Sequence, residues 1–244
     1  MRQSLAVLNA LLSIYFLTVP FSVNSFQSND ELISRARQKL YNLNRQGFSG
    51  FTASVEPNWE VILGPSAAPE SLRIFRAVRF ELTVDASGAI TLNHEVADAE
   101  KNRVQPFLKQ IDDNVRRLLA SFFNIWSIFT VSYFAESSNV FITVGNDLIV
   151  TEWKLVGPKA KQTIKPLFQK TDEGLLLTGY QSLFEPVGEG IKTSMQVSIE
   201  YADVGGMKLP HQVRFKGLRG NEPVEAELRF EHVIQSSRSK RLIV

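Results

Sequence analysis

The chain has 244 residues, of which 44% are hydrophobic and 21% are charged, and its formal net charge is +2. This composition is typical of globular proteins. Charges of both signs are interspersed, so the basic stripe that nucleic-acid binding requires is missing and we expect no nucleic-acid partner. The chain contains no cysteine, which excludes disulfides, thiol catalysis, thiolate metal sites and a lipid-modified cysteine.

The N-terminus has the pattern of a secretory signal peptide. Arg2 is the only charge before Asp30, the stretch 5–19 is mainly apolar, and Pro20 ends any helix. Small residues at 23–25 suit a signal peptidase, so we expect cleavage after Ser25 and removal of residues 1–25. A transmembrane anchor is the alternative, but the apolar run is shorter than the ~20 residues of a membrane span. We therefore expect a soluble periplasmic or secreted protein, peripheral to a membrane at most.

A helix and several short strands are predicted for the first part of the mature chain. Asn29 or Asp30 can cap a helix that has one apolar stripe, and we expect this helix to end at Gly47. Apolar patterns then predict strands over residues 48–55, 59–63, 74–84 and 90–94. The segment 64–70 is rich in glycine, serine, alanine and proline, which predicts a loop.

The middle of the chain changes to a helical period. From Asp98 to about Phe134 there is no glycine and a single proline, near the start. Residues 118–129 are apolar on nearly all sides, yet the run is short and polar residues interrupt it, which favours a buried helix over a transmembrane one. Phe122, Trp126 and Phe129 share one helical face, because they are spaced at i, i+4 and i+7. They are either core residues or the lining of a ligand site.

Strands return after this helix. We expect strands at 140–144 and 148–156, a hairpin of 162–170 with 175–181, and a loop over 184–190. Residues 195–234 predict a three-strand antiparallel meander with turns at 203–206 and 218–221, apolar on one face and wet on the other. Glutamates at 225, 227 and 231 face the same side as Arg214 and Lys216, which favours cross-strand ion pairs over paired catalytic carboxylates. Residues 236–244 form a basic tail.

These patterns predict one α+β domain over residues 26–235, mainly of antiparallel strands. A sheet of about ten strands with one apolar face must curl or be covered. The expected architecture is therefore a curved half-barrel with an N-terminal helix and an internal helix that acts as a lid or plug. Its interior is either an apolar cavity or a packed core, and the pattern leaves both open.

The run from Val197 to Phe215, VSIEYADVGGMKLPHQVRF, resembles outer-membrane lipoprotein-sorting proteins, the periplasmic lipoprotein carriers and their receptors. The similarity consists of a strand, an aspartate, a Gly-Gly turn, Leu-Pro and a second strand, followed by a charged alternating strand like Val224–Phe230. The order of signal peptide, opening helix, sheet, internal helix and closing meander is also similar. This resemblance implies a half-barrel with a helical lid that holds acyl chains.

No catalytic residue set is evident, so we expect a binding protein that is not an enzyme and has no cofactor. His94, His211 and His232 follow strand patterns without a second ligand at metal spacing, so we expect no metal site. The leading hypothesis is an exported protein that holds a lipid or acylated protein, in envelope lipid or lipoprotein trafficking. The alternative is an envelope module that binds a protein partner and has a packed interior. An enzyme would require a histidine to meet a carboxylate or a serine.

Overall fold

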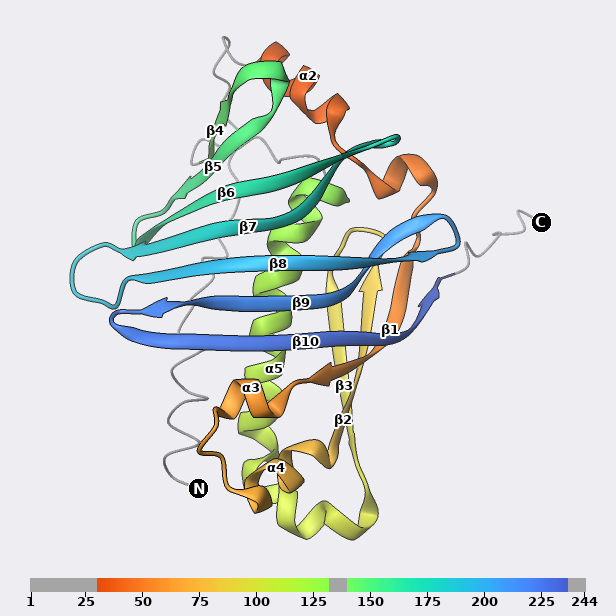
Figure 1. The fold of residues 1–244 in the computed structure, drawn as a ribbon, viewed down its shortest axis with the longest axis vertical. Coiled ribbons are helices and arrows are strands. Elements are labelled where there is room, and N and C mark those ends of the chain that lie inside the picture. Colours follow the sequence, from red (N-terminus) through yellow and green to blue (C-terminus); the bar gives the residue numbers. More distant parts are fainter. Residues whose placement is uncertain (1–29, 132–139, 237–244) are drawn as a thin grey trace.

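The computed structural model describes residues 30–131 and 140–236. The predicted signal peptide with its cleavage site after Ser25 lies outside the described residues, and so does the predicted basic tail except Ser236. Within the described residues the chain is an α+β fold dominated by one antiparallel sheet (Figure 1). This confirms the predicted fold class.

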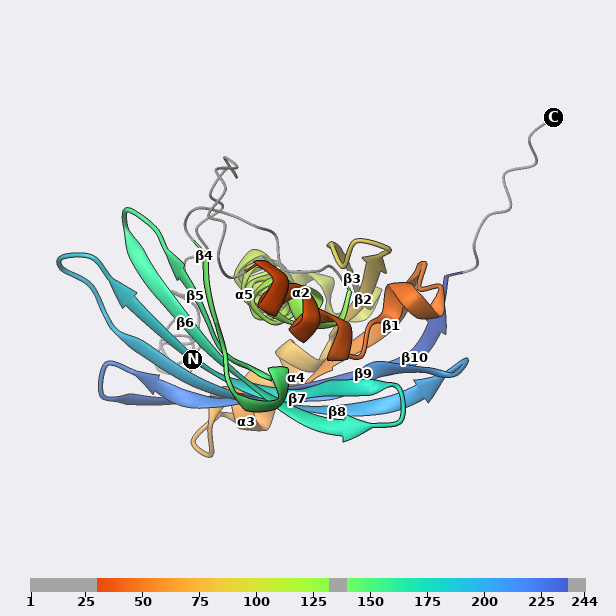
Figure 2. The same ribbon diagram turned by 90° about the horizontal axis from the view of Figure 1, so that it is seen from above.

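The sheet has ten strands in the order β3-β2-β1-β10-β9-β8-β7-β6-β5-β4. The strands are β1 Gly50–Pro57, β2 Val78–Asp85, β3 Ile90–Val96, β4 Val140–Val144, β5 Val150–Val156, β6 Ala160–Thr171, β7 Gly174–Pro186, β8 Thr193–Val204, β9 Met207–Arg219 and β10 Glu222–Gln235. The sheet curves like an open trough, and its edge strands β3 and β4 are not paired with each other (Figure 2). The sheet is therefore a half-barrel rather than a closed barrel.

One long helix, α5 Lys101–Thr130, lies along the concave side of the sheet (Figure 2). The face of α5 that meets the sheet is buried, whereas Arg117 and Asn124 on its other side are exposed. Residues 118–129 are therefore part of a largely buried helix, as predicted, although the helix has one exposed side. None of the helices in the described residues has the length and apolar character that a membrane span requires.

One short helix stands where the sequence predicts the strand 59–63, so that prediction is wrong, and a second short helix follows the predicted loop, which is present over residues 64–68. They are α3 Trp59–Leu63 and α4 Pro69–Arg76, and the following strand begins at Val78 rather than at residue 74. The Asn58 side chain accepts a hydrogen bond from the Val61 amide and caps α3, while Pro69 occupies the first turn of α4. Five residues are too few for the apolar pattern to separate a strand from a helix.

The N-terminal helix is shorter than predicted. Helix α2 Asp30–Lys39 ends before Leu40, and a separate 3₁₀ turn, η1 Leu43–Gln46, follows it. Gly47 ends η1 in the left-handed conformation, with a φ of 84°, which glycine adopts without strain. The predicted end of the helix at Gly47 is therefore wrong: the helix ends at Lys39, and Gly47 ends the 3₁₀ turn that follows it.

The C-terminal meander agrees with the prediction. Strands β8, β9 and β10 pair in sequence order, and Gly205 and Gly206 form the first turn with φ values of 60° and 82°. Two consecutive positive φ values match the turn that suits a tight hairpin. The predicted hairpin of residues 162–181 is likewise present as β6 and β7, although β7 continues to Pro186 into the expected loop.

Candidate functional site

The structure places the three predicted lining residues in the centre of the half-barrel. Phe122 and Trp126 are 0% exposed and Phe129 is 2% exposed. The ring centroids of Phe122 and Trp126 lie 6.4 Å apart, and Phe129 packs edge-on against Phe168 of β6 at 5.9 Å. These residues therefore belong to the contact between α5 and the concave face of the sheet.

This contact is wider than the predicted set. Phe123 packs on Phe122, Trp126, Phe51 of β1 and Phe230 of β10, with centroid separations of 4.8 to 6.1 Å. We call Phe51, Phe122, Phe123, Trp126 and Phe230 the aromatic cluster. Offset and edge-on ring contacts of this kind add to the energy of burial. The sequence showed which residues share a face of α5, but it held no signal for the strands that they meet.

The polar groups around the aromatic cluster are uncharged. The Tyr201 hydroxyl donates to the Leu177 carbonyl at 2.6 Å. Burial raises the pKa of both Tyr180 and Tyr201 far above that of an exposed tyrosine. Every buried polar side chain among the described residues is neutral. The interior therefore suits apolar groups and disfavours ionised ones.

Among the described residues, polar contacts join α5 to β3 near one end and to the N-terminal segment near the other. Near β3, Asp112 contacts His94 Nδ1 at 2.9 Å and Arg116 at 3.2 Å, and Arg116 also donates to the Leu92 carbonyl at 3.0 Å. We call His94, Asp112 and Arg116 the β3 tether. At the other end, the carbonyl of Val131 accepts from Asn44 at 2.7 Å and from Asn42 at 3.4 Å. Between these points the helix is held mainly by apolar packing.

The three histidines do not form one site. His94 meets a carboxylate, which the sequence analysis missed because residue 94 is in β3 and residue 112 is in α5. This contact joins α5 to β3, as does the bond from Arg116 to the Leu92 carbonyl. His211 Nδ1 contacts the Phe230 carbonyl at 3.2 Å, on another strand. Among the described residues no three histidine, aspartate or glutamate side chains cluster as metal ligands would.

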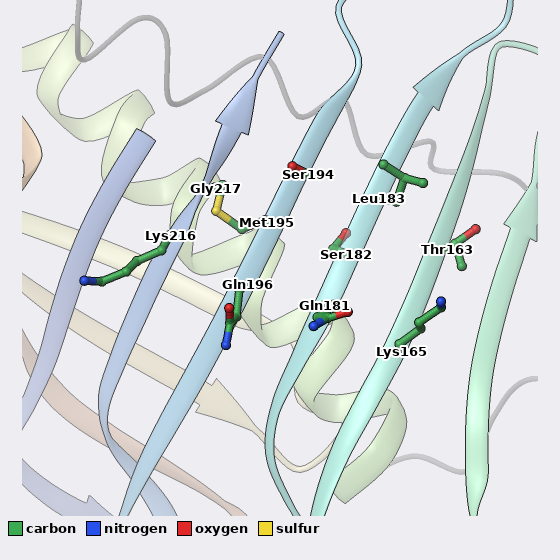
Figure 3. Close-up of a pocket in the computed structure, with 10 residues that line it drawn as sticks. All are labelled: Thr163, Lys165, Gln181, Ser182, Leu183, Ser194, Met195, Gln196, Lys216 and Gly217. Atoms are coloured by element: carbon green, nitrogen blue, oxygen red, sulfur yellow. The ribbon is translucent and has the colours of Figure 1, made fainter. Parts of the chain in front are cut away.

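Two surface cavities lie away from the aromatic cluster. A cavity of about 400 Å³ crosses strands β6 to β9, and Lys165, Gln181, Gln196 and Lys216 form a cross-strand row along it (Figure 3). These side chains lie on the side of the sheet away from α5, which we call the outer face. A cavity of about 550 Å³ involves β1, β2, β3 and β10, with His94 and His232 among its lining residues. Neither cavity is lined by Phe122, Trp126 or Phe129.

Comparisons with protein-family models, curated proteins and solved structures give no match. The resemblance of residues 197–230 to lipoprotein-sorting proteins therefore remains an expectation from the sequence. The candidate site is defined by its own geometry: the apolar concave face of the open sheet, which is covered by helix α5.

Proposed function

We propose that this is an exported protein that holds a lipid, or the acyl chain of a lipidated protein, in the trough of its half-barrel. The observation that carries the proposal is that one helix, α5, covers the apolar concave face of an open sheet. The trough is filled by the helix's own aromatic side chains. An acyl chain would take their place on the sheet when α5 moves outward.

The construction of the sheet supports this exchange. Because β3 and β4 are unpaired with each other, moving α5 breaks no strand pairing. The polar contacts described above that α5 must release are the β3 tether and the two asparagine bonds to the Val131 carbonyl. Such a movement of one packed element against a fixed scaffold is a common way of opening a binding site.

The energy scale is also suitable. Burial of an alkyl chain gains ~0.8 kcal/mol per methylene, so about fifteen methylenes gain roughly 12 kcal/mol before costs. Those costs include displacing α5 and ordering the chain. The neutral, raised-pKa tyrosines of the interior allow an alkyl chain to enter, while an ionised headgroup would remain in water at the mouth.

A cross-link across the β3 tether tests the proposal. The chain has no cysteine, so His94→Cys with Asp112→Cys creates the only two thiols, at side chains that touch in the structure. Bridging them with a short bis-maleimide should hold α5 in place and abolish capture of a fluorescent fatty acid. The same variant capped with N-ethylmaleimide should still capture it.

A matched control separates locking from chemical damage. Lys216→Cys with Glu225→Cys places a bridge between touching side chains on the outer face, where the wild-type atoms lie 2.9 Å apart. This bridge should leave capture unchanged. Residues 26–244, purified gently from the native envelope, should also carry a lipid or acyl-peptide adduct in native mass spectrometry. A bare mass together with no fatty-acid capture by the unlinked protein would sink the proposal.

The packed interior favours a second candidate function, an envelope module that binds a protein partner. Phe122 and Trp126 leave no exposed surface inside the trough. In that case the protein bridged across the β3 tether and the unbridged protein would give the same result in the fatty-acid capture assay. A protein partner would be retained on the bridged protein after mild cross-linking in the envelope.

A further inference from the structure

We propose that one end of the sheet docks on the surface of an anionic lipid bilayer. The surface consists of three turns, residues 157–159, 187–192 and 220–221, together with the adjoining outer face, and we call it the turn end. This inference goes beyond ligand capture and does not depend on it, because the aromatic cluster takes no part in it.

The three turns lie side by side although they are far apart in the sequence. Backbone hydrogen bonds of 2.8 Å join Val187 N–H to the Lys159 carbonyl and Gly220 N–H to the Lys192 carbonyl. These turns connect β5 to β6, β7 to β8 and β9 to β10, which all reverse at the left side of Figure 1. The sheet thus presents one continuous end.

Exposed aliphatic side chains gather on this end. Val187 is 58% exposed, Ile191 is 51% exposed and Leu218 is 47% exposed. Ile191 lies next to the neighbouring turn, since a Cβ built on Gly220 would be 3.5 Å from its Cγ2 atom. Val187 and Ile191 belong to the second turn and Leu218 to strand β9. Large apolar side chains that gather in water are typical of surfaces that meet a partner or a membrane.

The charges beside these side chains favour an anionic bilayer as the occupant. Lys192 bonds to Glu185 at 2.9 Å, and the pKa of that carboxyl is lowered by Lys192 first, and also by Lys161 and Lys154. Strands β5, β6 and β9 place four lysines on this part of the outer face, and Lys192 of the second turn makes a fifth, against three glutamates. They are Lys154, Lys161, Lys165, Lys192 and Lys216, with Glu152, Glu185 and Glu225. The remaining charged residues of the turns, Lys159 and Glu189, balance each other.

This combination suits the boundary between lipid headgroups and acyl chains. Aliphatic side chains enter the boundary, while lysines close behind them meet lipid phosphates. A protein partner would more often find aromatic anchors in such a patch, and Val187, Ile191 and Leu218 are all aliphatic.

Vesicle flotation tests the inference. The full mature chain should float with vesicles of phosphatidylglycerol and phosphatidylethanolamine, and far less with phosphatidylcholine alone or at high salt. The triple variant Val187→Ser, Ile191→Ser, Leu218→Ser should lose at least tenfold in partitioning. Lys161→Gln should reduce partitioning into the anionic vesicles about fivefold and leave partitioning into phosphatidylcholine vesicles unchanged. Leu167→Ser, which removes a 45% exposed leucine elsewhere on β6, should change nothing.

Three results would overturn the inference. They are equal flotation of the triple variant, no flotation of the wild-type chain, and flotation that does not depend on lipid charge. Circular dichroism is the control for whether the triple variant folds. The cross-linked protein with α5 held in place should float like the wild-type chain, so failure of membrane docking and failure of acyl capture are separate outcomes.

Discussion

Glu227 joins the outer face of the sheet to helix α3. Its side chain, 12% exposed, accepts from Asn58 at 3.1 Å and from Arg214 at 3.0 Å, and Arg229 lies 3.3 Å away. Arg214 also pairs with Glu200 at 2.7 Å, so the carboxylate belongs to a network across three strands. The predicted cross-strand ion pairs on this face are therefore present for Glu225 and Glu227.

Replacing Glu227 should make the stability of the protein less dependent on pH. Burial acts to raise the pKa of this carboxyl, but hydrogen bonds from Asn58 and Arg214 outweigh burial and lower it. Because the pKa of Glu227 is lower in the folded protein than in the unfolded chain, its ionised carboxylate stabilises the fold at pH values above the unfolded pKa of about 4.3. This stabilisation is lost as the pH falls through the lower pKa of the folded protein. We expect Glu227→Gln to destabilise the protein by about 1–3 kcal/mol at pH 7.

Urea unfolding at pH 7 and at pH 3 measures this effect. The difference between wild type and Glu227→Gln should shrink at the lower pH. Glu225→Gln is the control, because its partner Lys216 is largely exposed and such a surface pair contributes little. A constant difference at both pH values would show that the glutamine acts through packing instead.

At the scale of elements, the two halves of α5 contact the rest of the protein in different ways. Its C-terminal half carries the aromatic cluster, whereas its N-terminal half is joined to β3 by the polar β3 tether. Apolar burial is non-directional, whereas hydrogen bonds to a carboxylate join specific atoms. If α5 moves as proposed, we expect the tether to control how readily the N-terminal half of the helix leaves β3.

Removing the shared carboxylate should loosen the helix. In Asp112→Ala, His94 and Arg116 lose their common partner, and amide hydrogens of the N-terminal half of α5 should exchange faster, by roughly fivefold or more. Capture of the fluorescent fatty acid should also speed up. Asp113→Ala on the same helix removes a solvent-facing pair with Lys109 and should leave both rates unchanged. Equal exchange in the two variants would contradict the role of the tether.

At the scale of the whole molecule, the half-barrel separates two surfaces. The concave side and α5 form the proposed ligand site, and the turn end forms the proposed membrane contact. The turns belong to β5–β10, and α5 crosses the concave side of the same sheet (Figures 1 and 2). A protein that takes acyl chains from a bilayer would use both surfaces at once.

Ligand binding should raise the stability of the whole fold. A ligand held only by the folded protein stabilises it by about 2.7 kcal/mol at a hundredfold excess over its dissociation constant. We therefore expect palmitate to raise the thermal midpoint of the wild-type chain and of the Lys216/Glu225 cross-linked control. The protein cross-linked across the β3 tether should show no shift. A shift of the same size in that protein would place palmitate outside the trough.

Long periodic segments were predictable, whereas short ones were not. The meander, the hairpin of β6 and β7, and most of α5 have the correct type, because their periods run for many residues. Residues 59–63 were predicted as a strand but form a helix. The helix is stabilised by the Asn58 cap and by packing of Trp59 against Phe75, with ring centroids 5.0 Å apart. That contact joins segments on either side of a loop, beyond the reach of local periodicity.

The sequence by itself determined the chemistry of the faces: an apolar side and a charged side for most strands, and one aromatic face of α5. Only the tertiary structure decided which faces meet. It filled the trough with Phe122 and Trp126, brought His94 to Asp112, and set Ile191 beside the turn at Gly220. The physical reason is that strand register and helix placement are set by packing over the whole core, while periodicity reports only the orientation of each residue within its own segment.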